Sequence, residues 1–98
     1  MTNGVNERYT WNPEKRKQNL KERGLDFVLL ADDILSDPNV VIRQDNRCNY
    51  GEDRFLAYAL VEGKRLCLCF APREGKIHLI TIFMMHKKQW EANYGKSS

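Results

Sequence analysis

Trp11-Asn12-Pro13-Glu14-Lys15-Arg16-Lys17-Gln18-Asn19-Leu20-Lys21-Glu22-Arg23-Gly24-Leu25-Asp26-Phe27 predicts a helix with both of its ends marked. Asn12 is a good N-cap, and Pro13 stands at the first helical position, where proline is favoured. Gly24 suits the left-handed residue that follows many helices. Leu20 is the only large apolar residue inside the helix, whereas a surface helix usually carries a broad apolar stripe. The helix is therefore either a solvated flank or a binding surface.

A second helix is predicted directly after the first, with Asp26 as its cap. Phe27, Leu30, Ala31 and Ile34 recur at the spacing of one helix face, and the Ser-Asp-Pro-Asn run at 36–39 ends the pattern. Strands are then predicted over residues 40–43, 54–61, 65–71 and 76–84, with a polar loop at 44–53 and turns at 62–64 and 72–75. A short strand over 8–11 and a terminal helix over 87–94 complete the expected elements.

This order of elements predicts an α+β fold in which two N-terminal helices pack on one face of a small antiparallel sheet, followed by a short C-terminal helix. The 98 residues suffice for one domain, residues 1–98, with a modest core. Residues 1–7 and 95–98 are polar, and we expect them to be loosely held.

Charge is distributed unevenly along the chain. Residues 1–25 carry a net charge of +3, residues 26–54 carry −4 and residues 55–98 carry +4, which sum to the overall +3. The two basic ends could form one patch that attracts phosphates, while the acidic middle faces elsewhere. Charge alone favours the simpler alternative of an ordinary solvated surface.

The cysteines and the apolar segments indicate in which compartment the protein resides and whether it binds a metal ion. Cys48, Cys67 and Cys69 are an odd count without disulfide spacing, and neither a signal region nor an apolar run of membrane-spanning length is seen. We therefore expect a cytoplasmic protein that does not bind a membrane. Two thiols two residues apart could begin a metal site, but no second ligand pair completes it, so buried structural cysteine is the favoured interpretation.

Several polar residues could carry chemistry. Glu52 could accept a proton and Arg54 could clamp a phosphate, but their chemistry alone favours a turn with a surface ion pair. Arg73 lies in a predicted turn. His78 lies within a predicted strand and is interpreted as an ordinary strand residue. His86 is followed by two lysines, and these three groups together could hold a phosphate.

These residues together resemble a known family, the BrnT toxins. The opening, Asn12-Pro13-x-Lys15-x3-Asn19-x-Lys21-x-Arg23-Gly24-x2-Phe27, resembles the BrnT motif DP-x-K-x3-N-x2-KHG-x2-F. The likeness continues through Ala31, Ile34-Leu35 and Asp37-Pro38, then Gly51-Glu52-x-Arg54, Gly63-Lys64-x-Leu66 and Phe70-Ala71-x-Arg73. It covers about residues 10 to 82, and its specificity lies in the order and spacing of the motifs rather than in any one of them.

The resemblance implies a fold similar to the RelE-type ribonuclease toxins, cleavage of RNA without metal or cofactor, and neutralisation by a DNA-binding BrnA-like antitoxin through which the protein oligomerises. Carried over residue by residue, it assigns phosphate contacts to Arg54 and Arg73. Glu52 is then a base or the group that orients Arg54. Lys21 and Arg23 hold RNA, with the first helix as a lid over the site. His86 and Lys87, which do not come from the family motifs, are predicted to bind RNA because of the cations gathered there.

The last strand departs from the family pattern. BrnT proteins typically read R-I-I-S-A-R where this chain reads His78-Leu79-Ile80-Thr81-Ile82-Phe83, so the second arginine is absent. Loss of an arginine that contacts the transition state would cost orders of magnitude in rate. The alternative is a catalytically decayed module that binds RNA or a protein, using the apolar run at 82–85. That run could equally complete the core, with Trp90 and Tyr94 docking the terminal helix.

Overall fold

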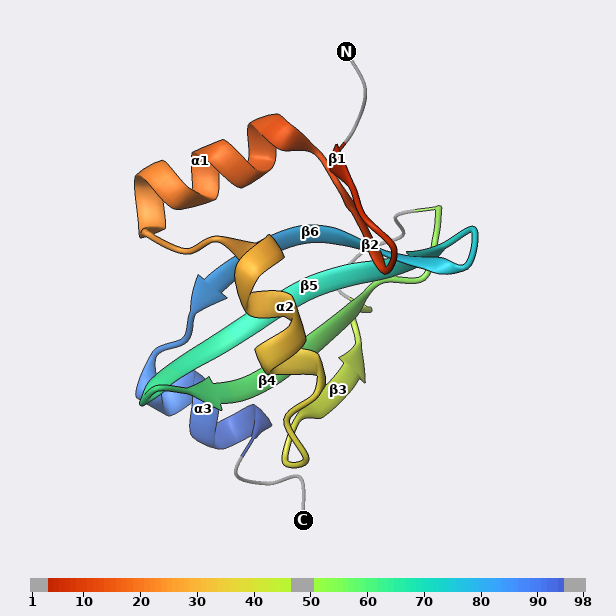
Figure 1. Cartoon of the computed structure of the whole chain (residues 1–98). Helices are drawn as coiled ribbons and strands as arrows, with labels where there is room; N and C mark the ends of the chain where they lie inside the picture. The colour runs from red at the N-terminus through yellow and green to blue at the C-terminus, as the bar shows by residue number, and fades with distance from the viewer. Residues whose placement is uncertain (1–3, 47–50, 95–98) are drawn as a thin grey trace.

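The structure is a computed structural model, and it describes residues 4–46 and 51–94. The strands are β1 (Gly4–Val5), β2 (Tyr9–Trp11), β3 (Val41–Gln44), β4 (Phe55–Val61), β5 (Lys64–Arg73) and β6 (Lys76–Met84). The helices are α1 (Pro13–Arg23), α2 (Phe27–Leu35) and α3 (Lys87–Asn93). Figure 1 shows α1 and α2 lying across a strongly twisted sheet. The predicted α+β fold is confirmed.

The six strands form one sheet in the order β1-β2-β6-β5-β4-β3. The predicted antiparallel meander from β3 to β6 is confirmed, but β2 lies parallel to β6, with Thr10 opposite His78, so the sheet is mixed rather than antiparallel. Residues 1–7 were expected to be loose, yet Gly4–Val5 pair with β2 as an edge strand. Gly4 lies against the Trp11 indole, where a side chain would clash.

Helix α1 has the predicted ends. The Asn12 side chain accepts hydrogen bonds from the backbone N–H groups of Glu14 and Lys15, and Gly24 takes the left-handed conformation at φ 67°. The helix is joined to the next one by an ion pair, because Arg16 Nη2 lies 2.9 Å from Asp26 Oδ2. Asp26 also caps α2 by accepting from the Val28 N–H.

Asn19 attaches α1 to the sheet, and Leu20 does not. Asn19 is 2% exposed, whereas Leu20 is 51% exposed. The Asn19 side-chain oxygen accepts from the Ile82 N–H at 3.2 Å and from the Thr81 hydroxyl at 3.1 Å. Because the pairing of β2 with β6 ends at Leu79, Asn19 supplies a partner for the β6 edge beyond that point.

Helix α2 and one face of the sheet enclose the main core. Phe27, Ala31 and Ile34 are fully buried there, as the helical spacing predicts, and Leu30 is partly buried. They pack against Leu66 and other sheet residues of the same face, among them Ala57, Ala59, Leu68, Phe70, Leu79 and Ile82. The apolar face predicted for the second helix is therefore confirmed.

The hairpin turns differ from the prediction in one place. Glu62 and Gly63 form the first turn with positive φ, as expected, but Pro72 and Arg73 belong to β5 and not to the second turn, which is Glu74-Gly75. Pro72 is tolerated in the strand because the pairing of β5 with β4 ends at Phe70, so the missing N–H falls where β5 has no neighbour on that side.

A β-bulge in β6 changes which face its residues occupy. Cys69 pairs with Thr81 whereas Phe70 pairs with Leu79, so Ile80 is an additional residue. Both Leu79 and Ile82 consequently lie in the main core although they are three residues apart. His78, which precedes Leu79, therefore lies on the opposite face of the sheet.

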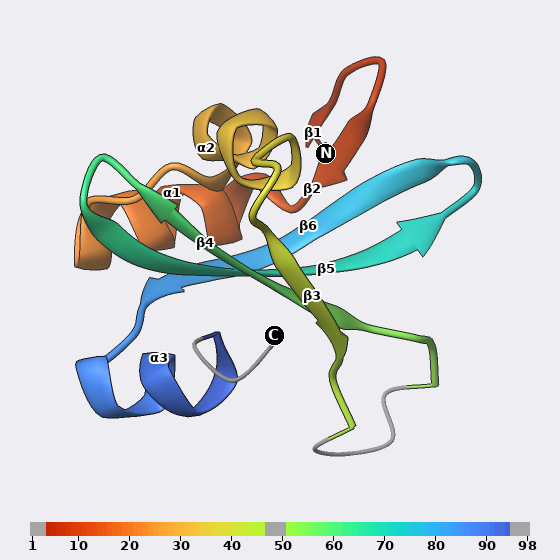
Figure 2. The same cartoon turned by 90° about the horizontal axis from the view of Figure 1, so that it is seen from below.

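Helix α3 covers part of that opposite face. Figure 2 shows α1 and α2 on one side of the sheet and α3 on the other. Trp90 is buried in a second core and stacks on Tyr94 with ring centroids 4.3 Å apart, so the predicted docking face is confirmed. The other members of this core include Tyr58, Cys67 and the partly buried Phe83 from the sheet, and Met85 just after β6. Among the described residues, no helix is long and apolar enough to cross a membrane.

The apolar run at 82–85 is mostly internal. Ile82 is fully buried in the main core and Met85 is 8% exposed in the second, whereas Met84 is 54% exposed. The run therefore completes the two cores and does not form a continuous apolar surface. Cys67 and Cys69 are buried in the sheet, and Cys48 lies outside the described residues.

Candidate functional site

Two arginines and one carboxylate meet at the end of the sheet that α3 leaves open. Arg73, near the end of β5, donates from Nε and Nη2 to the two oxygens of Glu52 at 2.9 Å and 2.7 Å. Arg54, just before β4, brings its Nε to 3.5 Å from Glu52 Oε2. Glu52 thus joins the β3–β4 connection to β5, and two guanidinium groups are held side by side.

A histidine lies beside these charges. His78 in β6 is 9% exposed, and its Nδ1 is 2.8 Å from the Thr10 hydroxyl in β2. Thr10, Arg73 and His78 line one hollow of about 560 Å³, whose other lining residues are Val5, Glu74 and Lys76. The hollow is therefore built from β1, β2 and the β5–β6 hairpin, and four of its six lining residues are ionisable.

The electrostatics of this site distinguish its two candidate bases. Hydrogen bonds from Arg73 hold the pKa of Glu52 below its ordinary value, and Arg54 adds to the effect. Burial lowers the pKa of His78, as does the charge of Arg73, while Glu52 opposes the change. At neutral pH the carboxylate is therefore charged and already occupied by arginine, whereas the imidazole is neutral and able to accept a proton.

Some predicted site residues are not part of this cluster. Arg23 Nη1 donates to the backbone oxygen of Ile82 at 2.9 Å and to Asn19, so it helps to hold α1 on the edge of β6. Lys21 is exposed near the same end of α1. Helix α1 packs on the face of the sheet opposite to Glu52 and Arg73, and the expectation that it forms a lid over those residues is therefore wrong.

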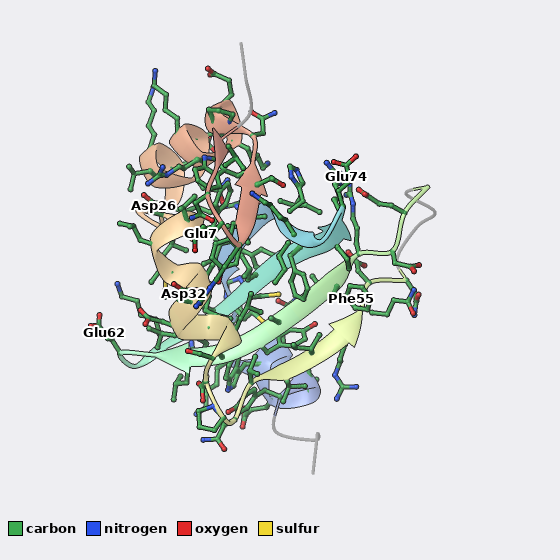
Figure 3. The ribbon with its side chains drawn as sticks, turned by 45° about the vertical axis from the view of Figure 1, so that its right-hand side comes forward. Glu7, Asp26, Asp32, Phe55, Glu62 and Glu74 are labelled. Atoms are coloured by element: carbon green, nitrogen blue, oxygen red, sulfur yellow. The ribbon has the colours of Figure 1, made fainter. Side chains whose placement is uncertain are left out.

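His86 and Lys87 lie at the other end of the sheet. His86 is the N-cap residue of α3 and Lys87 begins the helix, both of them exposed. Figure 3 shows Glu74 and Glu62, in the turns that flank β5, at opposite ends of the sheet. The Met85 N–H donates to the Arg65 backbone oxygen, so His86 and Lys87 follow β6 at the end of the sheet that carries the Glu62 turn. His78 lies at the other end, near the Glu74 turn. About 20 Å of strand separates His78 from Met84.

The sequence analysis did not identify His78 and Thr10 as members of the site. Thr10 comes from a short strand whose parallel pairing with β6 has no local signal in the sequence. His78 lies four residues before Ile82, and regular alternation would place both on the buried face. Only the bulge at Ile80 reverses this, so the open position of His78 depends on an irregularity that alternation does not predict.

The fold and the cluster together define a small α+β protein with two arginines paired to one carboxylate beside a partly enclosed hollow. The chain belongs to the family described as the ribonuclease toxin BrnT of type II toxin–antitoxin systems, whose model matches residues 11–89. The resemblance seen in the motifs is thereby confirmed, and membership of a type II system implies a cognate antitoxin. A search of curated protein sequences found no match.

Proposed function

We propose that this protein is an endoribonuclease toxin that cleaves RNA by attack of a ribose 2′-hydroxyl on the adjacent phosphate, without a metal ion. The observation that carries the proposal is the pair of guanidinium groups held by Glu52 beside the hollow lined by Thr10 and His78. We propose that a bound phosphate contacts both Arg73, which lines the hollow, and Arg54, which shares the Glu52 carboxylate with it.

The proposed chemistry needs mainly cations. As the 2′-oxygen bonds to phosphorus, the phosphate gains negative charge, which guanidinium groups in a partly water-excluded site stabilise. A planar guanidinium can bind two phosphate oxygens at once. Glu52 is better suited to orient Arg73 than to act as the base, because both of its oxygens accept from Arg73 and its pKa is lowered.

The remaining residues predicted to bind RNA lie outside the Glu52 cluster. We propose that His86 and Lys87 contact a distant part of the RNA, since both are exposed at the far end of the sheet. Lys21 is exposed on α1 and would have to contact RNA on the other side of the molecule. Arg23 is better explained as a structural residue, because it is bonded to Asn19 and Ile82.

The proposal is tested by incubating the purified protein with a mixed-sequence single-stranded RNA transcript in buffer containing a chelator. We expect cleavage, and we expect Arg73→Ala and Arg54→Ala each to lower the rate by roughly 10²–10³-fold, the usual cost of losing one transition-state contact. Expression of the wild-type protein alone should arrest growth, and that of the variants should not.

Arg8→Ala is the matched control for the two arginine variants. Arg8 is exposed, and its side chain pairs with Asp32 of α2 rather than with Glu52. Its loss should leave the cleavage rate within threefold of the wild-type rate. Wild-type rates in Arg54→Ala and Arg73→Ala would reject their assignment, and a wild-type protein that neither cleaves RNA nor arrests growth would reject the ribonuclease.

The alternative function is a non-catalytic module that binds RNA or a protein. It is motivated by the arginine missing near Phe83, with the apolar run at 82–85 as the binding surface, but that run is largely buried in the two cores. Tight binding of the transcript without cleavage by the wild-type protein would support this alternative.

We further propose that the cognate antitoxin is BrnA-like and that oligomers form through it. Co-expression of the neighbouring gene should restore growth, and the two proteins should elute together by size exclusion.

A further inference from the structure

A single histidine stands at the centre of the open face, where its surroundings bear on the proton transfer that RNA cleavage requires. Polar and charged residues from several elements surround His78. Thr10 comes from β2, Arg73 and Glu74 come from the end and turn of β5, and Lys76 begins β6. Glu52 and Arg54 approach from the segment before β4 and act on the His78 charge through space.

The Thr10 hydroxyl engages one ring nitrogen of His78 and leaves the other for a substrate. Thr10 Oγ1 is within hydrogen-bond distance of His78 Nδ1. If the hydroxyl accepts the proton of Nδ1, the lone pair of the neutral ring lies on Nε2, which is the state needed to remove a proton. Hydrogen bonding at the far nitrogen is the usual way in which proteins fix the tautomer and the orientation of a functional imidazole.

The other ionisable groups at the hollow are less suited to the task. Arg73 is a permanent cation. Lys76 donates from Nζ to the Asn6 backbone oxygen at 2.6 Å, and Glu52 is bonded by Arg73. Glu74 is exposed in the turn, beyond the sheet. His78 is 9% exposed and is flanked by β2 and β5, so its position at the hollow is the best defined.

We propose that His78 is the general base of the proposed RNA cleavage and that Thr10 is the residue that positions it. This inference rests on the proposed ribonuclease function. His78 Nε2 takes the proton of the ribose 2′-hydroxyl while the 2′-oxygen bonds to phosphorus. The bond from phosphorus to the 5′-oxygen breaks, and that oxygen takes a proton from water. The imidazolium then returns its proton to water, leaving a 2′,3′-cyclic phosphate and a 5′-hydroxyl.

The test is the pH dependence of single-turnover cleavage of the RNA transcript, with the protein in excess over RNA but well below saturation, so that the profile reports groups of the free protein. The wild-type rate should rise with pH and level off above an inflection below the ordinary pKa of histidine, because the neutral ring is the active form. His78→Gln should lose roughly 10²–10⁴-fold in rate together with the inflection. Its affinity for an all-2′-deoxy copy of the transcript should stay within threefold of the wild-type affinity.

Thr10 is tested separately, as a positioning residue. Thr10→Val should lower the rate and move the inflection, whereas Thr10→Ser should restore both because it keeps the hydroxyl. Equal rates and equal inflections in the valine and serine variants would remove Thr10 from the mechanism.

His86→Gln provides the control, because the chain has only two histidines. The inflection should persist in this variant whatever happens to RNA affinity. If His78→Gln does not fold, the ring of His78 can be titrated by NMR in His86→Gln, and its pKa must match the kinetic inflection. A mismatch, or a folded His78→Gln protein with wild-type rate and profile, would overturn the assignment. Absence of cleavage by the wild-type protein at every pH would instead reject the ribonuclease function itself.

Discussion

Asn19 shows how much one buried polar residue contributes to the attachment of α1. Its oxygen accepts from Ile82, Thr81 and Arg23, and its amide donates to the Lys15 backbone oxygen at 2.9 Å. A hydrophobic residue at this position would leave the Ile82 N–H without that partner. A buried group that loses its hydrogen bond costs about 1–3 kcal/mol, so α1 needs no apolar stripe to have a fixed place.

Asn19→Ala should therefore lower the free energy of unfolding by about 2–3 kcal/mol. Leu20→Ala, one residue further along the same helix, should change it by less than about 0.5 kcal/mol because Leu20 is exposed. Urea denaturation of both variants measures the difference. A larger loss for Leu20→Ala than for Asn19→Ala would contradict the account of how α1 is attached.

The charges around His78 predict opposite shifts of its pKa. Glu52 raises that pKa and Arg73 lowers it, so Glu52→Gln should move the pKa down and Arg73→Gln should move it up. Under the proposed mechanism the cleavage inflection should move with it. NMR titration of the ring provides the measurement. Glu62→Gln, in the turn at the opposite end of the sheet, should have no effect, and shifts of the same sign in the first two variants would contradict the assignment.

At the scale of single elements, α3 depends on few contacts. Trp90 is 8% exposed and packs edge-on against Tyr58, with ring centroids 6.5 Å apart, and stacks on Tyr94. Seven residues are too few for a helix that is stable in isolation, so the burial of Trp90 against the sheet holds α3 in place.

Trp90→Ala should accordingly destabilise the protein by about 3–5 kcal/mol, since it removes most of the side chain that joins α3 to the sheet. Glu91→Gln, exposed on the next residue, should have almost no effect. Thermal unfolding followed by circular dichroism compares the two variants. Equal melting temperatures for Trp90→Ala and Glu91→Gln would show that α3 is not held by this contact.

Helices and turns followed from the sequence wherever a single residue type determines the local conformation. Asn12, Pro13 and Gly24 mark the ends of α1, and the spacing of Phe27, Ala31 and Ile34 marks the buried face of α2. Arg73 and Glu52 were predicted as separate candidates, and the structure brings them together. The contact between His78 and Thr10 could not be predicted, because it needs both a parallel strand pair and a bulge.

At the scale of the whole molecule, the two faces of the sheet differ in how much of them the helices cover. One face is covered by α1 and α2, and the other is covered only at the end where α3 packs. The remaining end carries Arg54, Arg73 and Lys76 close to His78, together with the carboxylates of Glu52 and Glu74, so these charged groups sum to +1. A polyanion would therefore be attracted by the placement of the three cations rather than by a large total charge.

Salt dependence reports how many of these charges meet RNA. For single strands, the logarithm of the affinity falls with the logarithm of salt concentration by about 0.7 for each phosphate contacted. Arg54→Gln with Arg73→Gln should therefore lower the slope by about 1.4 for the all-2′-deoxy transcript. Lys17→Gln, exposed on α1 at the opposite face, should leave the slope unchanged. An unchanged slope in the double variant would place the RNA elsewhere.

The chemistry of the cleaved ends tests the central claim most directly. The wild-type protein would be incubated with a defined RNA oligonucleotide in buffer containing a chelator. The terminal groups of the products would be identified from their masses by mass spectrometry. Attack by the 2′-hydroxyl predicts a 2′,3′-cyclic phosphate on one fragment and a 5′-hydroxyl on the other, with Arg73→Ala forming both far more slowly. Intact RNA, or fragments that end in a 5′-phosphate and a 3′-hydroxyl, would contradict the account.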